Sequence, residues 1–404
     1  MPEQTIQQFA GINNKANPES LQSGWISPVK ESLPAELTAG SNIDITDRRE
    51  IRSRTGTTLQ VAGSPTSLWS DGEVAFYVDG GVLKRLWPDM TTTSIRSGVG
   101  ADVVFQRVDD RVYWTDGTLT GVIDNGLNRS WGLNPPLIAG LTSSGSGLLQ
   151  AGSYQVVLTA MRPNGVESGT ILPDTIDLAD NSSITVTWLD SGDTEISHIN
   201  IYVSNRDGEA LFLAGTAPVG DESFTHSGAP LSVPLNLQWL QKPPAGQWLT
   251  FYKGRILIAS GEEIYVTSTH SLEHVDLREY IACDGSRINM LASLESVVFI
   301  GTEEGVSVLQ GDAQGSLKAT RASIGRVVPG TAVIADGYEL FGRIELAGQN
   351  VVVFVSVEGV LAGFADGTLV NLTSDSYDVT ARRKGAALFR GTSDVHQYIV
   401  VQQQ

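Results

Sequence analysis

The most regular pattern along the chain is a short apolar run, a tight turn of small or charged residues, and a second apolar run. In GRILIASGEEIYVTS, residues 254–268, the apolar runs are Ile256–Ala259 and Ile264–Val266, and the turn is Ser260-Gly261-Glu262-Glu263. Two short apolar runs on either side of such a turn predict a β-hairpin.

This hairpin pattern repeats along the chain. Starts at residues 73 and 111 lie 38 residues apart, and starts at 254 and 296 lie 42 apart, close to the ~40–45 residues of one propeller blade. The turn Asp336-Gly337 within 331–346 predicts a further hairpin, because Asp-Gly between alternating apolar residues favours one. The repeats are at 73–87, 111–126, 254–268, 296–311 and, in a longer form with turns at Glu358-Gly359 and Asp366-Gly367, 350–373.

A different pattern interrupts the repeats. Apolar residues alternate in Ile184, Val186 and Trp188 and again in Ile199, Ile201 and Val203. Turns at 163–165 and 206–208 separate short strands, one of them over Tyr154–Met161, which is typical of a small β-sandwich. Trp188 and Tyr202 resemble the buried aromatic residues of a fibronectin type III domain, and we expect both in its core.

Spacing indicates that this sandwich is an insertion. The hairpins at 111 and 254 are 143 residues apart, and removal of the 98 residues 135–232 leaves about one blade period. The linker signals Asn134-Pro135-Pro136 and Lys242-Pro243-Pro244 flank it. The predicted organisation is therefore all-β: 1–134, an N-terminal segment and the first propeller blades; 135–232, an inserted fibronectin type III-like β-sandwich; and 233–404, the remaining blades and a closing strand.

The two ends of the chain provide candidates for closing the propeller. Residues 42–54 predict two short strands around a turn at Asp47-Arg48-Arg49, and Tyr398–Val401 predicts a last strand. We expect that last strand to pair with 42–54, which gives about six blades. Arg48, Arg49, Arg52 and Arg54 form a basic cluster. The alternatives are contact with phosphate and pairing with acidic groups of this chain or of a neighbouring subunit, and we expect the pairing.

Composition narrows the class of protein. The 404 residues are 41% hydrophobic, contain 43 Gly, and include no apolar run long enough to span a membrane as a helix. The first twenty residues lack the basic and apolar regions of a signal peptide, so we expect assembly in a cytosol. The net charge of −18 disfavours a binder of duplex DNA, because phosphate neutralisation supplies most of the affinity of such proteins.

Candidate chemistry is sparse, and we predict no catalytic, cofactor-binding or metal-binding residues and no cofactor. His270 and His274 would share one face of a helix, but no Glu follows His270 as a zinc-protease motif requires, so we expect two polar loop histidines. Cys283, the single cysteine, is expected in a core or loop. Two adjacent carboxylate pairs, Glu262 with Glu263 and Glu303 with Glu304, are expected at hairpin tips as solvated charge. The tetrapeptide at 113–116, Tyr-Trp-Thr-Asp, is expected to be a strand ending in an Asp-Gly turn.

Three segments together resemble the tail nozzle and tail-hub proteins of tailed bacteriophages. They are GINNKANPESL followed by NIDITDRREIRSRTGTT, INMLASLESVVFIGTEEGVSVLQGD (288–312), and AGSYQVVLTAMRPNGVESG (151–169). The resemblance implies a virion structural protein, non-enzymatic, which assembles in the host cytoplasm as a homo-oligomeric ring of six copies in the tail. It implies contacts with adaptor or portal-proximal proteins and with tail fibres or spikes. Viral DNA would pass through the lumen during ejection, and an acidic lumen would repel its phosphates.

A second function class stays open at this stage. Many propellers bind or cleave carbohydrates, so the alternative is a carbohydrate-binding or glycan-cleaving propeller that acts in host-receptor recognition. It predicts a concave site on the central face of the propeller, with clustered aromatic and carboxylate side chains. The repeated Asp-box motif of sialidases is absent from the sequence.

Overall fold

Strands make up almost all of the regular structure in a computed structural model of the chain. The structure describes residues 9–16, 35–46, 48–54, 56, 58–170, 172–189, 193–269, 271–283, 286–311, 318–392 and 395–403. Within these ranges there is one short α-helix, α1 (Gly337–Phe341), and one 3-10 helix, Ile344–Leu346. The described part of the chain holds no helix long and apolar enough to cross a membrane. The all-β prediction is confirmed.

Five sheets share one plan: four antiparallel strands in chain order. The first is β5 (Thr66–Ser70), β6 (Ala75–Asp79), β7 (Val82–Leu86) and β8 (Thr92–Ser97). The second is β9 (Val104–Val108), β10 (Arg111–Thr115), β11 (Thr120–Asp124) and β12 (Leu127–Arg129). The third is β20 (Trp248–Tyr252), β21 (Arg255–Ser260), β22 (Glu263–Ser268) and β23 (Ser271–Ala282). The fourth is β24 (Ile288–Ser293), β25 (Val298–Thr302), β26 (Gly305–Gln310) and β27 (Lys318–Ile324). The fifth is β28 (Val333–Asp336), β29 (Asn350–Ser356), β30 (Gly359–Gly363) and β31 (Leu369–Asn371).

The repeated hairpins are the middle strands of these sheets. In the 254–268 hairpin Leu257 pairs with Val266 and Ser260 with Glu263, so the turn is Gly261-Glu262. Gly261 has φ +65°, a conformation that glycine adopts without steric cost. The strand pairings confirm the predicted hairpins at 73, 111, 254, 296 and 350. They form because the apolar segments and the turn residues favour the same structure at each site.

The prediction of a hairpin at Asp336-Gly337 is wrong. Asp336 ends β28, and α1 (Gly337–Phe341) begins directly after it. The Asp336 carboxylate accepts hydrogen bonds from the backbone N–H groups of Tyr338 (2.8 Å) and Glu339 (3.3 Å). Asp before Gly therefore serves here as a helix N-cap, and the strand that pairs with β28 starts only at Asn350.

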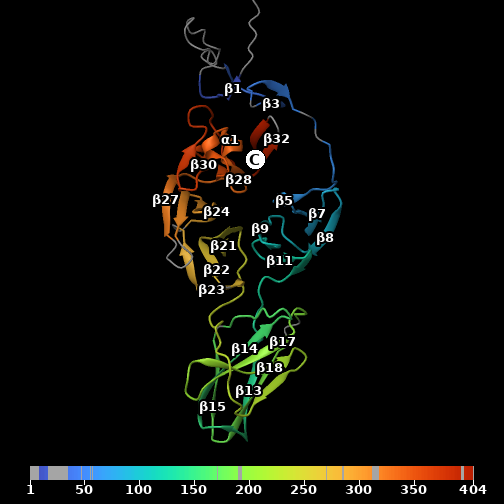
Figure 1. The fold of residues 1–404 in the computed structure, drawn as a ribbon, viewed down its shortest axis with the longest axis vertical. Helices are drawn as coiled ribbons and strands as arrows, with labels where there is room; N and C mark the ends of the chain where they lie inside the picture. Colours follow the sequence, from blue (N-terminus) through green and yellow to red (C-terminus); the bar gives the residue numbers. More distant parts are fainter. Residues whose placement is uncertain are drawn as a thin grey trace, which may run out of the picture.

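Neighbouring sheets pack against each other through apolar side chains, and Figure 1 shows these sheets next to one another in chain order. Trp69 and Phe76 of the first sheet stack with Phe105 of the second, with ring centroids 5.6–6.3 Å apart. Phe299 of the fourth sheet reaches Gly363 of the fifth, where an added Cβ would come 2.6 Å from its ring. Each interface therefore depends on side chains that alternate along the strands, as a blade-built fold requires.

Residues 138–226 form a separate two-layer sandwich. One sheet has the order β13 (Ile138–Leu149), β16 (Ser182–Trp188), β19 (Ser223–His226), and the other the order β15 (Asp174–Leu178), β14 (Gly152–Met161), β17 (His198–Ser204), β18 (Leu211–Pro218). Trp188 lies in the core between the sheets, as expected. Tyr202 is buried too, but against Val157 and Leu211, because it alternates with Ile201 and Val203 and so lies on the opposite face of β17.

The expected closure of the ring by the last strand is wrong for the described residues. The last strand, β33 (Val395–Gln403), pairs with β32 (Lys384–Thr392), and β3 (Ile43–Ile45) pairs with β4 (Ile51–Ser53). Pairing with the adjacent strand closes a much shorter loop than pairing across some 350 residues. Arg390 Nη1 lies 3.3 Å from Asp44 Oδ2, so the two hairpins meet through side chains. A third pair, β1 (Phe9–Ile12) and β2 (Ala35–Leu37), is parallel.

The arginines of the N-terminal cluster differ in their surroundings. Arg54 pairs with Asp44 at 2.9 Å, as expected for a basic residue of an acidic chain. Arg48 and Arg49 are exposed. Figure 1 places the N-terminal strands β1 to β4 and the sandwich at opposite ends of the molecule, with the four-stranded sheets between them.

Candidate functional site at the root of the sandwich

Buried charged side chains cluster where the sandwich joins the third sheet. Glu273 lies on β23, Arg129 ends β12, and Arg162 directly follows β14. Glu195 lies in the loop before β17. The side chains of Glu273 and Arg162 are 5% and 4% exposed, so both charges are almost fully removed from water.

Glu273 is the centre of this cluster, which we call the root network. Its Oε1 accepts a hydrogen bond from Arg129 Nη2 at 2.8 Å. Its Oε2 accepts one from the backbone N–H of Gly132 at 2.6 Å and a longer one from Arg162 Nη1 at 3.4 Å. Both carboxylate oxygens therefore have donors, and the donors come from the second sheet, the linker and the sandwich.

Glu195 extends the root network to the surface. Arg162 Nη2 donates to Glu195 Oε2 at 2.6 Å and to the Ser130 carbonyl at 2.8 Å. The backbone N–H of Ser130 donates to Glu195 Oε1 at 3.0 Å. Arg162 thus joins a loop of the sandwich to the linker that leads into it.

The electrostatics of Glu273 favour the ionised form. Burial on its own would raise the pKa of this carboxyl group, since desolvation penalises a charge. The hydrogen bond and charge of Arg129, the Gly132 N–H and the charge of Arg162 outweigh burial and lower the pKa below its ordinary value. A carboxylate held in this way is a poor proton acceptor at neutral pH, so the root network is suited to holding parts together rather than to acid–base chemistry.

His274, next to Glu273, makes a second connection. Its Nε2 lies 2.7 Å from the carbonyl oxygen of Glu167 and its Nδ1 lies 2.9 Å from Ser271 Oγ. A carbonyl only accepts, so Nε2 carries the proton and Nδ1 accepts from the serine. Burial lowers the pKa of His274, which therefore stays neutral.

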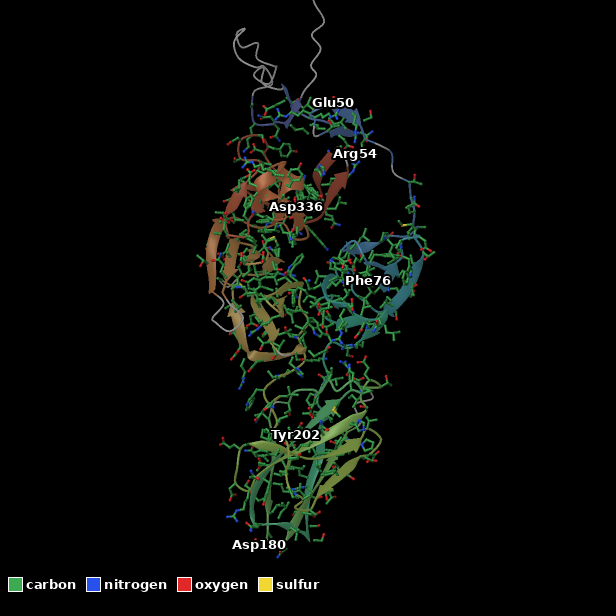
Figure 2. All side chains as sticks on the ribbon, viewed as in Figure 1. Glu50, Arg54, Phe76, Asp180, Tyr202 and Asp336 are labelled. Carbon is green, nitrogen blue, oxygen red and sulfur yellow. The ribbon has the colours of Figure 1, made fainter. Side chains whose placement is uncertain are left out.

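The Glu167 carboxylate organises the sandwich side of this connection. It accepts hydrogen bonds from Asn200 Nδ2 at 2.8 Å, from the Tyr202 hydroxyl at 2.9 Å, and from the Thr159 hydroxyl. Burial and the adjacent carboxylate raise the pKa of Tyr202. Figure 2 shows Asp180 at the end of the sandwich farthest from the four-stranded sheets and Tyr202 nearer to those sheets. Because Tyr202 donates to Glu167, these polar contacts lie toward the end of the sandwich that joins the rest of the chain.

Both linkers of the sandwich pass through the root. Gln241 forms an antiparallel bridge with Val275 of β23, with N–H to oxygen distances of 2.8 and 2.9 Å. Gly132 has φ +76°, and a Cβ there would lie 2.7 Å from Lys242 Cβ. A Cβ on Gly169 would lie 1.9 Å from the Leu240 carbonyl oxygen. The two connections therefore lie against each other and against β23.

A pocket of about 390 Å³ opens beside the root. Its lining includes the cationic Arg96 and Lys242, the indole of Trp131, and the amides of Asn134 and Gln241. Trp131 itself is held by a hydrogen bond from its Nε1 to the Leu272 carbonyl at 2.7 Å. Apolar and polar groups are mixed here, as in sites that bind small polar molecules.

The candidate residues from the sequence lie elsewhere or serve structural roles. His270 is outside the described residues, and His274 lies on a strand rather than on a helix or in a polar loop. Glu262, Glu303 and Glu304 are exposed at hairpin tips, as expected, and Glu263 is half-buried. Asp116 accepts backbone hydrogen bonds from Thr118 and Leu119, which confirms the strand-and-turn interpretation of 113–116. Cys283 is buried. No cluster of three metal-ligating side chains occurs within the described ranges.

Sequence reasoning missed the root network. Glu273 is separated from Arg162 by 111 residues and from Arg129 by 144, so no spacing rule could join them. The available signal was local: two adjacent ionisable residues, Glu273 and His274, inside a segment that forms a strand, and Arg162 immediately before the turn at Pro163. Charges at such positions need buried partners.

Comparison with known proteins finds distantly similar structures but no similar sequence or family. No protein-family model and no curated protein sequence matches the chain. A BBS1N–ARL6DN complex matches with 12% identity and a TM-score of 0.30, over 85% of this chain and 95% of that one. A catalytically inactive virginiamycin B lyase from Staphylococcus aureus, with quinupristin, matches with 11% identity and a TM-score of 0.33, over 85% and 94%. Apo AztD from Citrobacter koseri matches with 10% identity and a TM-score of 0.30, over 78% and 74%. Scores at this level support no assignment of function.

Proposed function

We propose that this chain is a non-enzymatic structural subunit of a bacteriophage tail, located in the virion. In this proposal it is a β-propeller of six blades. The five four-stranded sheets are complete blades, and the hairpin β32–β33 is a sixth that lacks two strands. The sandwich is a fibronectin type III-like domain inserted between the second and third blades. The three segments that resemble tail nozzle and tail-hub proteins support the assignment.

The observation that carries the proposal is the root network. A domain joined by two flexible linkers would move freely, as most neighbouring domains do. Here Glu273 and Arg162 are almost fully buried at the junction, Arg129 is 14% exposed, and the second linker is paired with β23. A sandwich held at one fixed angle is what an assembled particle needs if every copy must present the same arm to a fibre or spike.

Charge supports the proposed position around a DNA channel. The chain has 27 basic and 45 acidic residues, for a net charge of −18. An acidic wall repels phosphate, so the duplex would slide past without binding. In this proposal six copies form the ring beneath adaptor or portal-proximal proteins, after assembly in the host cytoplasm.

The proposal is tested on the purified full chain and on intact particles. Native mass spectrometry and negative-stain microscopy should find closed rings, and mass spectrometry of purified virions should find the chain in the tail. A protein that stays monomeric at every concentration and is missing from virions would refute the assignment.

The pocket beside the root favours a second candidate, carbohydrate binding in receptor recognition. The amides of Asn134 and Gln241 and the cations Arg96 and Lys242 could contact a sugar that carries a carboxylate, whereas Trp131 is buried beneath them. The described lining contains no Asp or Glu, so it offers no acid–base pair for glycan cleavage. A glycan array with the wild-type chain and a Lys242→Ala variant tests this candidate, and a blank array would eliminate it.

A further inference from the structure

The pocket beside the root lies where separate parts of the chain meet. Arg96 comes from β8 of the first sheet, Leu277 from β23 of the third sheet, and Thr170 from the loop between β14 and β15 of the sandwich. Both linkers add to the wall, with Asn134 on the first and Lys242 on the second. A molecule bound in this pocket would therefore touch the sandwich, its linkers and the sheets at the same time.

The ionisable side chains of the described lining are both cations. Neither Arg96 nor Lys242 forms an ion pair or a side-chain hydrogen bond with another described residue. The Nε of Arg96 is buried without a hydrogen-bond partner, and its guanidinium lies 5.8 Å from the centroid of the Trp114 ring. The arginines of the root network, by contrast, are paired with Glu273 and Glu195.

The positive charge of the pocket opposes the charge of the chain. The whole sequence has 45 acidic and 27 basic residues, yet the described lining contains no Asp or Glu. Two like charges that line one pocket repel each other, and an anion bound between them removes that cost. The pocket is therefore electrostatically suited to an anion, in a protein whose net charge of −18 otherwise repels one.

Neutral polar side chains provide further hydrogen-bonding groups. Asn134 and Gln241 line the pocket, and their side-chain amides form no hydrogen bond with another described residue. Thr170 is only 5% exposed, and its backbone is hydrogen-bonded to residues 237 and 239. Its hydroxyl likewise has no partner in the described part of the chain. Since buried polar groups are usually hydrogen-bonded, these groups can serve the hydroxyl groups of a ligand.

The size of the pocket indicates an organic ligand. Its volume of about 390 Å³ lies at the small end of the ~300–1,000 Å³ of sites that bind organic molecules. The buried indole of Trp131 forms part of the wall, so the site also offers an apolar surface to a carbon skeleton. A small hydroxylated molecule that carries a carboxylate or a phosphate matches the volume, the cations and the neutral polar groups together.

We propose that this pocket binds a small hydroxylated organic oxyanion, and that the bound ligand holds the sandwich against the sheets. Arg96 and Lys242 contact the charged group, since hydrogen bonds between ions are the stronger ones. The wall is complete only while the root is closed, so the ligand binds the closed form and shifts the equilibrium toward it. The inference goes beyond both candidate functions, because it gives the ligand a role at the junction and requires neither a virion nor a receptor.

Calorimetry on the full chain tests the class of ligand. The probes are glucose, glucuronate, glucose 6-phosphate and inorganic phosphate, and the sugars share one ring but differ in charge. Glucuronate, glucose 6-phosphate or both should bind at least about tenfold more tightly than glucose, and their order separates carboxylate from phosphate. The inference is overturned if none of the probes binds, if glucose binds as tightly as the charged sugars, or if inorganic phosphate matches glucose 6-phosphate.

Variants of the two cations test where the charged probe binds. Arg96 is half-buried, so Arg96→Gln should weaken the binding of the tighter charged sugar at least about tenfold. Lys242 is exposed, so Lys242→Gln should weaken it roughly threefold, and this variant keeps the test decisive if Arg96→Gln fails to fold. Arg343→Gln removes an exposed cation outside the described lining and is the matched control, which should bind like the wild type.

Hydrogen exchange tests the link between the ligand and the junction. At ten times its dissociation constant, a ligand of the closed root should slow exchange there about tenfold. The amides of Gln241 and Val275, which pair the second linker with β23, should show this change, whereas those of β26 should not. Unchanged exchange at Gln241 and Val275, or cation variants that bind like the wild type, would overturn the inference and leave the ring assembly untouched. A blank glycan array beside tight binding of glucose 6-phosphate would eliminate receptor recognition and support the role at the junction.

Discussion

Replacement of Glu273 by Gln tests whether the root network holds the sandwich in place. Gln keeps the size of the side chain but removes the charge that Arg129 and Arg162 share. Removal of one member of a buried ion pair costs about 3–5 kcal/mol, because the remaining charge stays desolvated. Arg162 keeps Glu195 at 2.6 Å and Arg129 keeps Asp124 at 3.8 Å, so we expect the lower end, about 3 kcal/mol.

The loss of about 3 kcal/mol should appear as opening of the junction between the sandwich and the third sheet. The sandwich has its own core around Trp188, and the third sheet packs around Ile256 and Val275 in another. At about 1.4 kcal/mol per tenfold change, 3 kcal/mol corresponds to roughly 100-fold more frequent opening of the root. Hydrogen exchange of residues 130–132 and 162–170 measures this opening, and limited proteolysis of the linkers provides a second readout.

Glu195→Gln is the matched control. Glu195 belongs to the same network and contacts the same arginine, but its side chain is 28% exposed. Water can replace much of its interaction, so we expect a change of about 1 kcal/mol or less. Equal exchange at the root in Glu273→Gln, Glu195→Gln and the wild type would show that burial of the network contributes nothing to the position of the sandwich.

Three further predictions concern the same junction. The pKa of Glu273 is lowered from its ordinary 4.5, so its contribution to the free energy of unfolding is complete above that pH and is lost as the pH falls through the lower pKa of the folded state. The stability difference between the wild type and Glu273→Gln, measured in thermal melts, should therefore shrink below about pH 4.5. Burial also lowers the pKa of His274, so the folded state opposes its protonation and stability should fall as the pH drops below 6.5; His274→Gln should flatten this part of the pH profile, and an unchanged slope would contradict the assignment. Gly169→Ala should displace the second linker, because the added Cβ would lie 1.9 Å from the Leu240 carbonyl oxygen, and hydrogen exchange at the Trp239 amide should become faster. Gly145→Ala is the control: nothing lies within 4 Å of its added Cβ, so it should behave like the wild type.

The hairpins could be predicted from the sequence because their causes are local. Ile256–Ala259, Gly261 and Ile264–Val266 specify strand, turn and strand within fifteen residues, and the pairing follows from them. Asp336-Gly337 misled for a physical reason: an Asp side chain can accept backbone N–H groups at a helix start as well as in a turn. Whether Asp336-Gly337 formed a hairpin turn or began a helix depended on where the next strand-forming segment began, which is Asn350.

The candidate site could not be predicted from the sequence, because its geometry is made by contacts between distant segments. Arg129, Arg162 and Glu273 belong to three different parts of the chain and meet only when the sandwich is docked. Tyr202 was expected in the core with Trp188, but strand alternation places it on the other face. The assignments of a fibronectin type III-like fold, of the domain boundaries 135 and 232, and of six blades stay predictions.

The adjacency of the two linkers has a consequence for the order of folding. Between β12 and β20 lie the 118 residues 130–247, yet β20 packs beside β9, and Phe251 N donates to Gln106 Oε1 at 3.1 Å. Joining these segments through an unstructured loop of that length carries a large entropic cost. A sandwich that folds first brings Gly132 and Lys242 together and shortens the loop to about nine residues, which lowers the closure cost by about 2 kcal/mol. The inserted domain is then expected to raise the rate at which the sheets assemble, because its folding brings the second and third sheets close together.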